Sequence, residues 1–248
     1  PRPMPDLKLS IVVPALNEQD NVQPLVEQID AVMQQASLAY ELIVIDDGST
    51  DATLERLRTL AGTFASLRIL HRDKPRGQSA AMGAGIAAAQ APYVATLDAD
   101  LQNDPADLPK MLDLLKREHA DMVQGDRSHA RQDNIVRRYG SIVGRKCRLW
   151  VLGDRVRDTG CSARVMRATY ARQIPLQFNG VHRFFPAYVA LLGGRVIEMQ
   201  ASHRPRTAGE TKYGMGVLTR GPRGLFDLFA VKWMKSRWRD AAVEEVRV

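Results

Sequence analysis

An apolar strand leads directly into an acidic pair in the stretch Tyr93-Val94-Ala95-Thr96-Leu97-Asp98-Ala99-Asp100. Because side chains alternate along an extended strand, Asp98 and Asp100 would lie on the same side of it. Two carboxylates placed in this way can bind one hard divalent cation, and such a cation would neutralise the diphosphate of a nucleotide. Asp104-Pro105 is also a good helix start, so an acidic turn that caps a helix is an alternative.

Predicted strands and helices alternate on both sides of this stretch. Short apolar runs predict strands at residues 9–14, 42–45, 67–70, 93–97 and 122–125. Apolar residues at helical spacing predict helices over 22–33, 54–60, 77–89 and 108–115, the second of them capped by Ser49, Thr50 or Asp51. This alternation predicts an α/β fold with a Rossmann-like, mostly parallel sheet and helices on both faces.

The pattern becomes less regular after residue 130. We expect a helix over 135–152, a strand over 163–166, a helix over 181–192 and a strand over 195–199. No linker is long enough to separate two domains. We therefore divide the chain into an N-terminal arm (1–8), one globular domain (9–212) and a C-terminal amphipathic helix with its tail (213–248).

Composition and charge limit the class of protein. Of 248 residues, 45% are hydrophobic and 25% charged, and no run approaches the roughly 18 apolar residues of a membrane span. No signal-like segment opens the chain, so we expect a cytoplasmic protein in which Cys147 and Cys161 are free thiols. The net charge of +7 lies mostly after residue 126, which predicts a nucleotide-binding front half and an anion-handling back half.

Polar loops follow three of the predicted strands, at residues 14–18, 46–49 and 98–102. The carboxyl ends of parallel strands meet at one edge of a sheet, so these loops should converge on one crevice. Adjacent acids repel each other, so a ligand or partner is expected for Asp46 and Asp47, whereas Glu18 and Asp51 could instead cap helices. No Gly-x-Gly-x-x-Gly loop follows the first strand, which argues against a Rossmann oxidoreductase.

These loops resemble the motifs of one known family. Val12-Val13-Pro14-Ala15-Leu16-Asn17-Glu18, Asp46-Asp47-Gly48-Ser49-Thr50-Asp51 and Asp98-Ala99-Asp100-Leu101-Gln102 resemble the inverting nucleotide-sugar glycosyltransferases of family two, which have the GT-A fold. The match continues with Gly125-Asp126-Arg127, Arg137 with Ser141, Asp158-Thr159-Gly160, His182-Arg183-Phe184 and the stretch from Arg206 to Tyr213. Their order is similar to that of the polyprenyl-phosphate hexose synthases, which include the dolichyl-phosphate mannose synthases, and the resemblance spans roughly residues 9 to 236.

The resemblance implies a donor site and a metal site. The nucleotide-sugar site would consist of Pro14, Ala15, Asn17, Glu18, Asp46, Asp47, Gly48, Asp98, Ala99 and Asp100. Asp46 or Asp47 could accept a hydrogen bond from the imino group of the base. Asp98, Asp100 and Gln102 would hold Mg²⁺ or Mn²⁺, which would stabilise the charge that accumulates on the leaving diphosphate.

The resemblance also implies a phosphate acceptor. Its binding positions would be Arg127, Arg137, Ser141, Arg206 and Lys212, and the catalytic group would be Asp98, Asp100, Gln102, Arg127, Arg206 and Lys212. A lipid phosphate is already largely anionic at neutral pH, so no strong general base is needed. Arg206 and Lys212 flank a flexible turn, which we expect to act as a lid over bound phosphates. A lone histidine beside aromatic residues, such as His182, is more often structural than a base.

The C-terminal segment predicts contact with a membrane surface. Residues 225–238 place Phe226, Phe229, Ala230 and Trp233 on one helical face and put Lys232, Lys235 and Arg239 on another. Aromatic and basic residues together can seat a helix among lipid headgroups. The alternative is that the apolar face packs on the globular domain or on a partner subunit.

We therefore expect a hexosyltransferase that moves a sugar from a nucleotide-diphosphate sugar to undecaprenyl or dolichyl phosphate, in cell envelope glycan biosynthesis. It would work at the inner face of the cytoplasmic membrane, peripherally or with a membrane partner protein, and a homo-oligomer is an open alternative. No nucleic-acid partner is expected. The competing hypotheses are transfer to a hydroxyl of a soluble glycan or protein, which would need a base, and a non-catalytic basic binding module.

Overall fold

The computed structural model describes residues 6–129, 144, 146–153, 156–204 and 216–239. Its strands are β1 (Leu9–Ala15), β2 (Tyr40–Asp46), β3 (Leu67–His71), β4 (Tyr93–Thr96), β5 (Met122–Asp126), β6 (Arg164–Arg167) and β7 (Val196–Gln200). Its helices are α1 (Val22–Gln35), α2 (Thr53–Ala61), α3 (Gln78–Ala88), α4 (Asp107–Arg117), α6 (Ala168–Ala171), the 3-10 helix η1 (Val181–Phe184), α7 (Phe185–Leu191) and α8 (Gly216–Arg237). The predicted alternation of strands and helices is confirmed.

The seven strands form one sheet in the order β3-β2-β1-β4-β6-β5-β7. All the neighbouring pairs are parallel except those of β6, which runs antiparallel to both β4 and β5. The prediction of a mostly parallel α/β sheet is therefore correct. The strand order reverses between β1 and β4, and in sheets of this kind ligands bind beyond the carboxyl ends of the strands at such a point.

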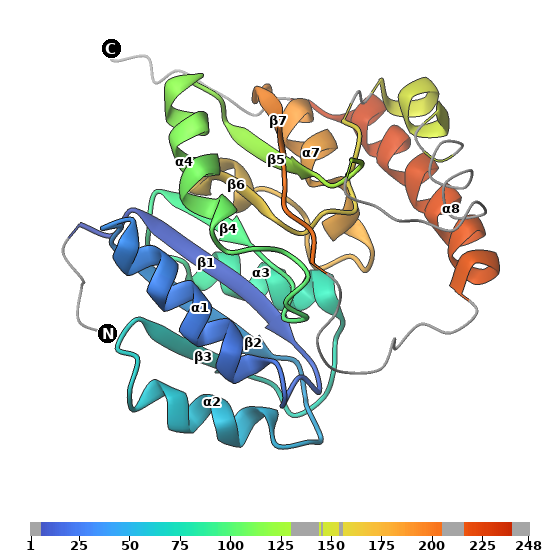
Figure 1. Ribbon diagram of the computed structural model, residues 1–248. Coiled ribbons are helices and arrows are strands. Elements are labelled where there is room, and N and C mark those ends of the chain that lie inside the picture. Colours follow the sequence, from blue (N-terminus) through green and yellow to red (C-terminus); the bar gives the residue numbers. More distant parts are fainter. Residues whose placement is uncertain (1–5, 130–143, 145, 154–155, 205–215, 240–248) are drawn as a thin grey trace, which may run out of the picture.

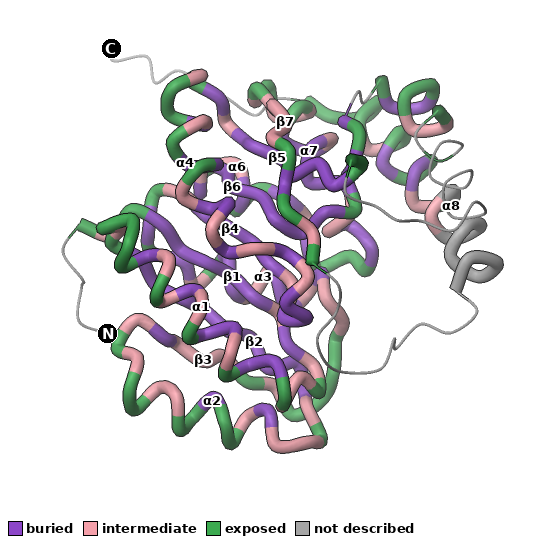
Figure 2. Tube along the Cα trace, in the orientation of Figure 1, coloured by how far each residue is buried: buried purple, intermediate pink, exposed green. Residues whose placement is uncertain are grey.

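Helices cover both faces of the sheet and divide the core in two (Figure 1). Apolar side chains of α1, α2 and α4 form one cluster with one face of the sheet, whereas those of α3, α6, η1, α7 and α8 form the other. The central strands accordingly make a buried layer between helices with exposed outer sides, whereas the edge strands β3 and β7 are mostly half-buried (Figure 2). No helix in the described part of the chain is long and apolar enough to cross a bilayer.

Small residues let α3 lie close against the sheet. A Cβ atom added to Gly85 would come within 2.5 Å of Val12 Cγ1 and 2.6 Å of Ile45 Cδ1, so the helix could not approach this closely with a larger residue. The alanine- and glycine-rich sequence of α3 therefore suits its close packing on the sheet. The close approach brings the first turn of α3 to the carboxyl end of β1.

Several local predictions need correction. Asp98-Ala99-Asp100 is not an extended strand, because β4 ends at Thr96 and the acidic pair lies in a turn in which Leu101 has φ 61°. The helix expected over 181–192 begins as η1 and continues as α7. The N-cap of α2 is Ala52 and not Ser49, Thr50 or Asp51 as expected. Most of the helix expected over 135–152 lies outside the described residues, although 146–152 are helical.

Candidate functional site

One pocket of about 230 Å³ lies beyond the carboxyl ends of β1, β2 and β4. Its walls come from the three loops that were expected to converge, together with the first turns of α3. The lining residues are Pro14, Ala15, Leu16 and Glu18 at and after the end of β1, Asp47 after β2, Asp98, Ala99 and Asp100 after β4, and the N-cap Gly77 with Gln78 and Ala81 of α3. The convergence of these loops thus places four acidic residues around one cavity. Glu18 follows β1, Asp47 follows β2, and Asp98 and Asp100 follow β4.

The first loop is fastened to the second. Asn17 has φ 50°, and its side-chain oxygen accepts a hydrogen bond from the Thr50 backbone N–H at 2.8 Å. Its own N–H donates to the Ser49 hydroxyl at 2.9 Å, and the N–H of Glu18 donates to the Thr53 hydroxyl at 2.8 Å. Asn17 itself is exposed and does not line the pocket, so in this structure it holds the loop after β1 against the loop after β2.

The two adjacent acids after β2 have different surroundings. Asp46 is fully buried behind the pocket, where its carboxylate contacts His71 Nδ1 at 2.7 Å and accepts the Ser49 N–H. Asp47 faces the pocket and accepts backbone N–H groups of Arg76 and Gly77, the latter at 2.7 Å. Of the pair, therefore, only Asp47 is placed to meet a ligand.

Gly48 contributes through its conformation. Its φ is 81°, and an added Cβ atom would lie 2.8 Å from backbone atoms of Lys74 and Pro75. Only glycine allows this approach, which brings the segment before α3 against the loop after β2. Gly48 does not line the pocket.

Asp98 and Asp100 both line the pocket, although they sit in a turn. One carboxylate oxygen of Asp98 accepts a hydrogen bond from the Gln78 side-chain amide at 2.7 Å, and its backbone N–H donates to Ser162 Oγ at 3.1 Å. Asp100 accepts the Gln102 N–H at 3.2 Å. Burial raises the pKa of Asp98, and the nearby negative charge of Asp100 raises it further.

This arrangement fits a hard divalent cation. Two carboxylates that repel each other inside a pocket supply the oxygen ligands that Mg²⁺ and Mn²⁺ prefer, and a cation would relieve the repulsion. Within the described ranges, no group of three or more His, Cys, Asp and Glu side chains is arranged to hold a metal ion. The side chain of Gln102, the third expected ligand, does not line the pocket.

Arg127 occupies a different environment from the one expected for an acceptor-binding residue. It is 9% exposed, and its Nε donates to the Asp158 carboxylate at 2.9 Å. The same carboxylate group accepts the backbone N–H of Gly160. Burial alone would lower the pKa of Arg127, but the hydrogen bond and charge of Asp158 produce a net rise. The guanidinium is thus committed to a buried ion pair that joins the end of β5 to the loop before β6.

The other expected acceptor residues cannot be placed. Arg137, Ser141, Arg206 and Lys212, together with the turn expected to act as a lid, lie outside the described residues. Their roles remain predictions. Cys147 and Cys161 are free thiols, as expected.

Two residues around Asp98 were missed by the sequence analysis. Gln78 holds the Asp98 carboxylate, and Ser162 Oγ accepts the Asp98 N–H while also accepting from the Asn103 side chain at 2.8 Å. No local pattern marks either residue, because each contact joins segments that are 20 or more positions apart.

Arg164 was missed as well, although a signal existed. It lies on β6 between Thr96 and Gln124, is 2% exposed, and its guanidinium is 4.7 Å from the Phe185 ring centroid. Its charge acts on Asp98 from behind the pocket. Burial lowers the pKa of Arg164 to about 10, so it stays charged at neutral pH. An arginine inside an otherwise apolar predicted strand is the signal that could have revealed it.

Several known proteins are similar to this chain in sequence. Dodecaprenyl-phosphate galacturonate synthase of Rhizobium johnstonii is 39% identical over 92% of this chain and 68% of its own length. Undecaprenyl-phosphate 4-deoxy-4-formamido-L-arabinose transferase of Aeromonas hydrophila is 34% identical over 85% of this chain and 64% of its own length. The chain therefore spans about two thirds of the length of these relatives.

A solved structure supports the fold independently. Glucosyl-3-phosphoglycerate synthase from Mycobacterium tuberculosis, in complex with Mn²⁺, UDP and phosphoglyceric acid, is 21% identical, covers 95% of this chain and 80% of its own, and superposes with a TM-score of 0.65. At this identity the likeness shows the GT-A fold alone. The model of the family described as glycosyl transferase family 2 matches residues 10–175, and the chain belongs to that family.

Proposed function

We propose that the protein transfers a sugar from a nucleotide-diphosphate sugar to a polyprenyl phosphate. The observation that carries this proposal is the pocket in which Asp98 and Asp100 face Asp47 and the first turn of α3. The two curated relatives described above bear the names of a dodecaprenyl-phosphate synthase and an undecaprenyl-phosphate transferase, which supports a polyprenyl phosphate as the acceptor.

The donor would lie across the pocket with its diphosphate at Asp98 and Asp100. A divalent ion held there would supply positive charge to the leaving nucleoside diphosphate, and solved structures of the same fold contain Mn²⁺ or Mg²⁺ with UDP. Gln78 fixes the direction of the Asp98 carboxylate, and Asp47 keeps the backbone before α3 against the pocket. These contacts pre-organise the protein groups before the donor arrives.

The acceptor oxygen needs no protein base in this reaction. A phosphate monoester titrates near pH 6, so at neutral pH an anionic oxygen can attack the anomeric carbon as the bond to the diphosphate breaks. Inversion follows from attack opposite the leaving group. We propose that Arg137, Ser141, Arg206 and Lys212 bind the acceptor phosphate, as their resemblance to the family pattern implies. Arg127 would act indirectly, because its guanidinium is held by Asp158.

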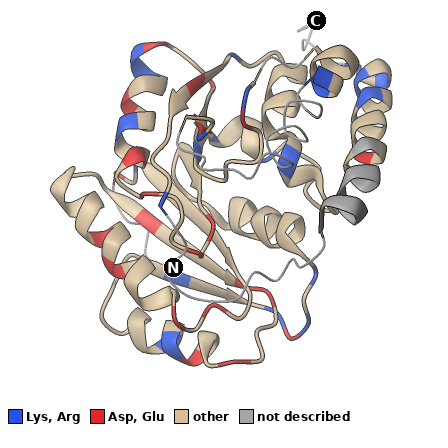
Figure 3. Ribbon diagram, turned by 45° about the vertical axis from the view of Figure 1, so that its right-hand side comes forward, with Lys and Arg blue, Asp and Glu red and all other residues tan. Residues whose placement is uncertain are grey.

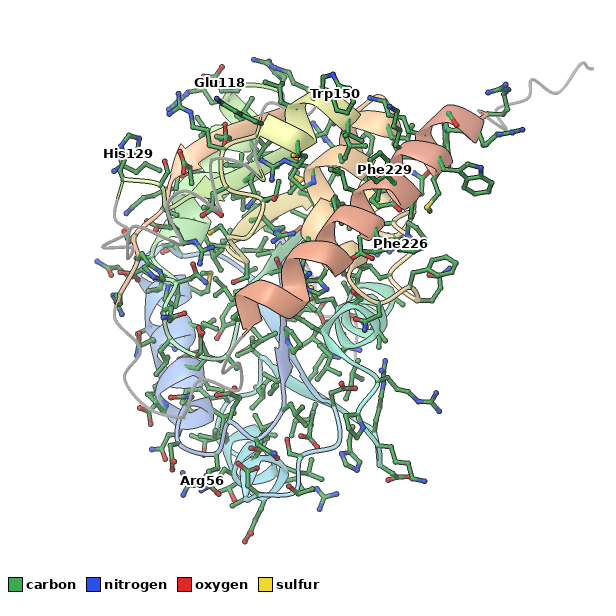
Figure 4. All side chains as sticks on the ribbon, turned by 90° about the vertical axis from the view of Figure 1, so that its right-hand side faces the viewer. Arg56, Glu118, His129, Trp150, Phe226 and Phe229 are labelled. Atoms are coloured by element: carbon green, nitrogen blue, oxygen red, sulfur yellow. The ribbon has the colours of Figure 1, made fainter. Side chains whose placement is uncertain are left out.

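We further propose that α8 rests on the membrane surface. Leu228 and Val231 pack into the core, whereas Phe226 and Trp233 are 77% and 63% exposed. The apolar face expected to bind a membrane is therefore not the face that packs on the domain. Figure 4 shows Phe226 pointing away from α8.

A neighbouring helical segment extends this surface. Trp150, at 82% exposure, lies with its ring centroid 5.7 Å from Lys232 Nζ. The last turn of α8 carries Lys235 and Arg237, and basic positions are seen at this end of the helix in Figure 3. Exposed aromatic rings beside basic side chains suit the headgroup region of an anionic membrane.

The proposal is tested by incubating the protein with UDP- and GDP-sugars, Mn²⁺ or Mg²⁺, and undecaprenyl phosphate. The expected product is a lipid-linked sugar whose formation stops on addition of EDTA. Arg206→Ala should lower turnover with the lipid phosphate more than it weakens nucleotide binding. Transfer of the sugar to soluble glycans or peptides in place of the lipid would refute the proposed acceptor. Binding of nucleic acid without any consumption of the nucleotide-sugar would refute the proposed enzymatic activity.

A further inference from the structure

His182 lies at a junction of three elements, outside the pocket lining. Its backbone N–H donates to Ser79 Oγ at 3.3 Å, and its ring Nδ1 lies 2.7 Å from the same oxygen. Its carbonyl oxygen accepts a hydrogen bond from Arg164 Nη1 at 3.0 Å. Residues of η1, α3 and β6 therefore meet at this one histidine, although 103 positions separate His182 from Ser79.

The protonation of the ring follows from these contacts. Ser79 Oγ accepts the His182 backbone N–H and also forms a hydrogen bond with Nδ1, in which the direction of donation depends on the tautomer of the ring. Burial, together with the positive charges of Arg183 and Arg164, lowers the pKa of His182 to about 3. A neutral ring whose Nδ1 is already hydrogen-bonded to Ser79 is poorly suited to take a proton from a substrate.

Ser79 connects this junction to the donor pocket. It is 1% exposed and belongs to the first turn of α3, next to Gln78, whose amide holds the Asp98 carboxylate. Gly77 precedes it with φ 89°, and the N–H of Gly77 binds Asp47. Three consecutive residues at the start of α3, the N-cap Gly77 and the helical residues Gln78 and Ser79, thus contact the acid after β2, the acid after β4 and η1 respectively.

Arg164 closes the arrangement into a ring of contacts around Asp98. Its guanidinium binds the carbonyl groups of His182 and Cys161. Ser162, the next residue along from Cys161, accepts the Asp98 N–H. The contacts therefore form a closed path. It runs from Asp98 to Gln78 and its neighbour Ser79, then to His182 and Arg164, and returns to Asp98 through Cys161 and its neighbour Ser162. A break at His182 would free the first turn of α3 on the side away from the pocket.

We propose that His182 is a positioning residue of the donor pocket, which acts through Ser79 on the first turn of α3. The inference rests on the proposed donor site, because its effect is to keep Gly77 and Gln78 in place for the nucleotide diphosphate. It assigns no proton transfer to His182. The ring instead serves as a hydrogen-bond partner that holds Ser79 in a fixed position.

Substitutions at His182 distinguish the two ring nitrogens. His182→Asn places an amide group near the position of Nδ1, where it can still hydrogen-bond to the Ser79 hydroxyl, whereas His182→Gln reaches the position of Nε2. We expect His182→Ala, His182→Gln and Ser79→Ala each to weaken the binding of UDP or GDP with Mn²⁺ about tenfold, measured by calorimetry. His182→Asn should stay within about twofold of the wild type, and the His182→Ala/Ser79→Ala double variant should be no worse than either single variant.

Kinetics give a second readout. The donor KM should rise by about the same factor while kcat changes by less than about twofold, and the pH profile of kcat should not move. Additive losses in the double variant, or better function of His182→Gln than of His182→Asn, would overturn the inference. A fall in kcat together with a displaced pH profile would show proton transfer instead.

The two proposals fail in different ways. Nucleotide binding needs no acceptor, so a wild-type protein that binds UDP or GDP with Mn²⁺ but ignores the His182 and Ser79 substitutions would refute only the positioning role. A wild-type protein that binds neither nucleotide would refute the donor site and this inference with it. Ser79→Ala carries the test if His182→Ala does not fold, which thermal unfolding would reveal.

Discussion

The guanidinium of Arg127 and the carboxylate of Asp158 form an ion pair of 2.9 Å whose two side chains are 10% and 6% exposed. Arg127 also donates its backbone N–H to Asp158 at 3.3 Å, so one carboxylate holds both the main chain and the side chain. Loss of one partner would leave a buried charge without compensation. The pair therefore matters for stability before any contact with an acceptor is considered.

Arg127→Met should destabilise the fold by about 3 kcal/mol or more, because Asp158 would keep its charge in a buried position. Urea unfolding followed by circular dichroism measures this loss. Arg157→Gln is the matched control, since Arg157 is 56% exposed and lies 3.9 Å from Asp126. An Arg127→Met protein of unchanged stability that fails only with the lipid acceptor would favour direct phosphate binding by Arg127.

Asp100→Ala should reduce sugar transfer by about a hundredfold or more, because the pocket loses one of its two candidate metal ligands. The unfolding midpoint should hardly change. Initial rates at several Mn²⁺ concentrations check the prediction, and Asp113→Ala on the exposed side of α4 is the control. Wild-type turnover in Asp100→Ala would remove the metal from the proposed mechanism.

Gln78→Ala should lower kcat/KM for the donor by about tenfold, since the Asp98 carboxylate loses a hydrogen bond to an uncharged donor and becomes free to rotate. The same variant should need more Mn²⁺ for half-maximal activity. Gln23→Ala is the matched control, because Gln23 is an exposed glutamine of α1 whose side-chain amide donates a hydrogen bond to Glu27 on the same helix. Equal metal requirements in both variants would contradict the role of Gln78.

The stability of the protein should fall as the pH drops from 6.5 toward 3. His182 has an ordinary pKa of 6.5 in the unfolded chain, and burial lowers its folded-state pKa to about 3. Between these two pH values His182 binds a proton in the unfolded state but not in the folded state, so unfolding becomes more favourable as the pH falls. The free energy of unfolding at pH 7 and pH 5 should therefore differ more for the wild type than for His182→Asn. An equal difference in both proteins would contradict this, and the exposed His129→Asn variant serves as control.

Phe226→Ser/Trp233→Ser should weaken binding to vesicles that contain anionic lipid by about tenfold or more, because each buried aromatic ring contributes roughly 1.5–3 kcal/mol. Cosedimentation measures the bound fraction. Arg56 lies at the other end of the molecule from Trp150 (Figure 4), so Arg56→Ser should bind like the wild type. Unaltered binding of the double variant would point to a partner protein or to another membrane-facing surface.

The sequence predicted strands well because their signals are local. Apolar runs such as Leu42 to Ile45 are bounded by polar loops, and loops after parallel strands must meet at one edge of a sheet. The conformation of Asp98-Ala99-Asp100 was not predictable by the same rule, because strand alternation says nothing about where a strand ends. Its turn depends on contacts with Ser162 and Gln78, which are distant in sequence.

Buried polar groups were the harder part of the site. The burial of Asp46 and of Arg127 depends on partners at His71 and Asp158, and neither partner is marked by spacing. The sequence showed that these residues were charged and followed strands, but a charged residue at a strand end can face a ligand or a partner inside the protein. Only the packing of the chain decides between the two.

The cluster that contains Ala81 and Met82 of α3 also contains Leu228 and Val231 of α8. Protein interiors transmit displacement because they are packed as densely as crystals of small molecules. If α8 lies on a bilayer, the proposed donor pocket is then held at a fixed height above the lipid. Lipid phosphates of different tail length would then be presented to the pocket at the same level, so the pocket would not distinguish them by the length of their tails.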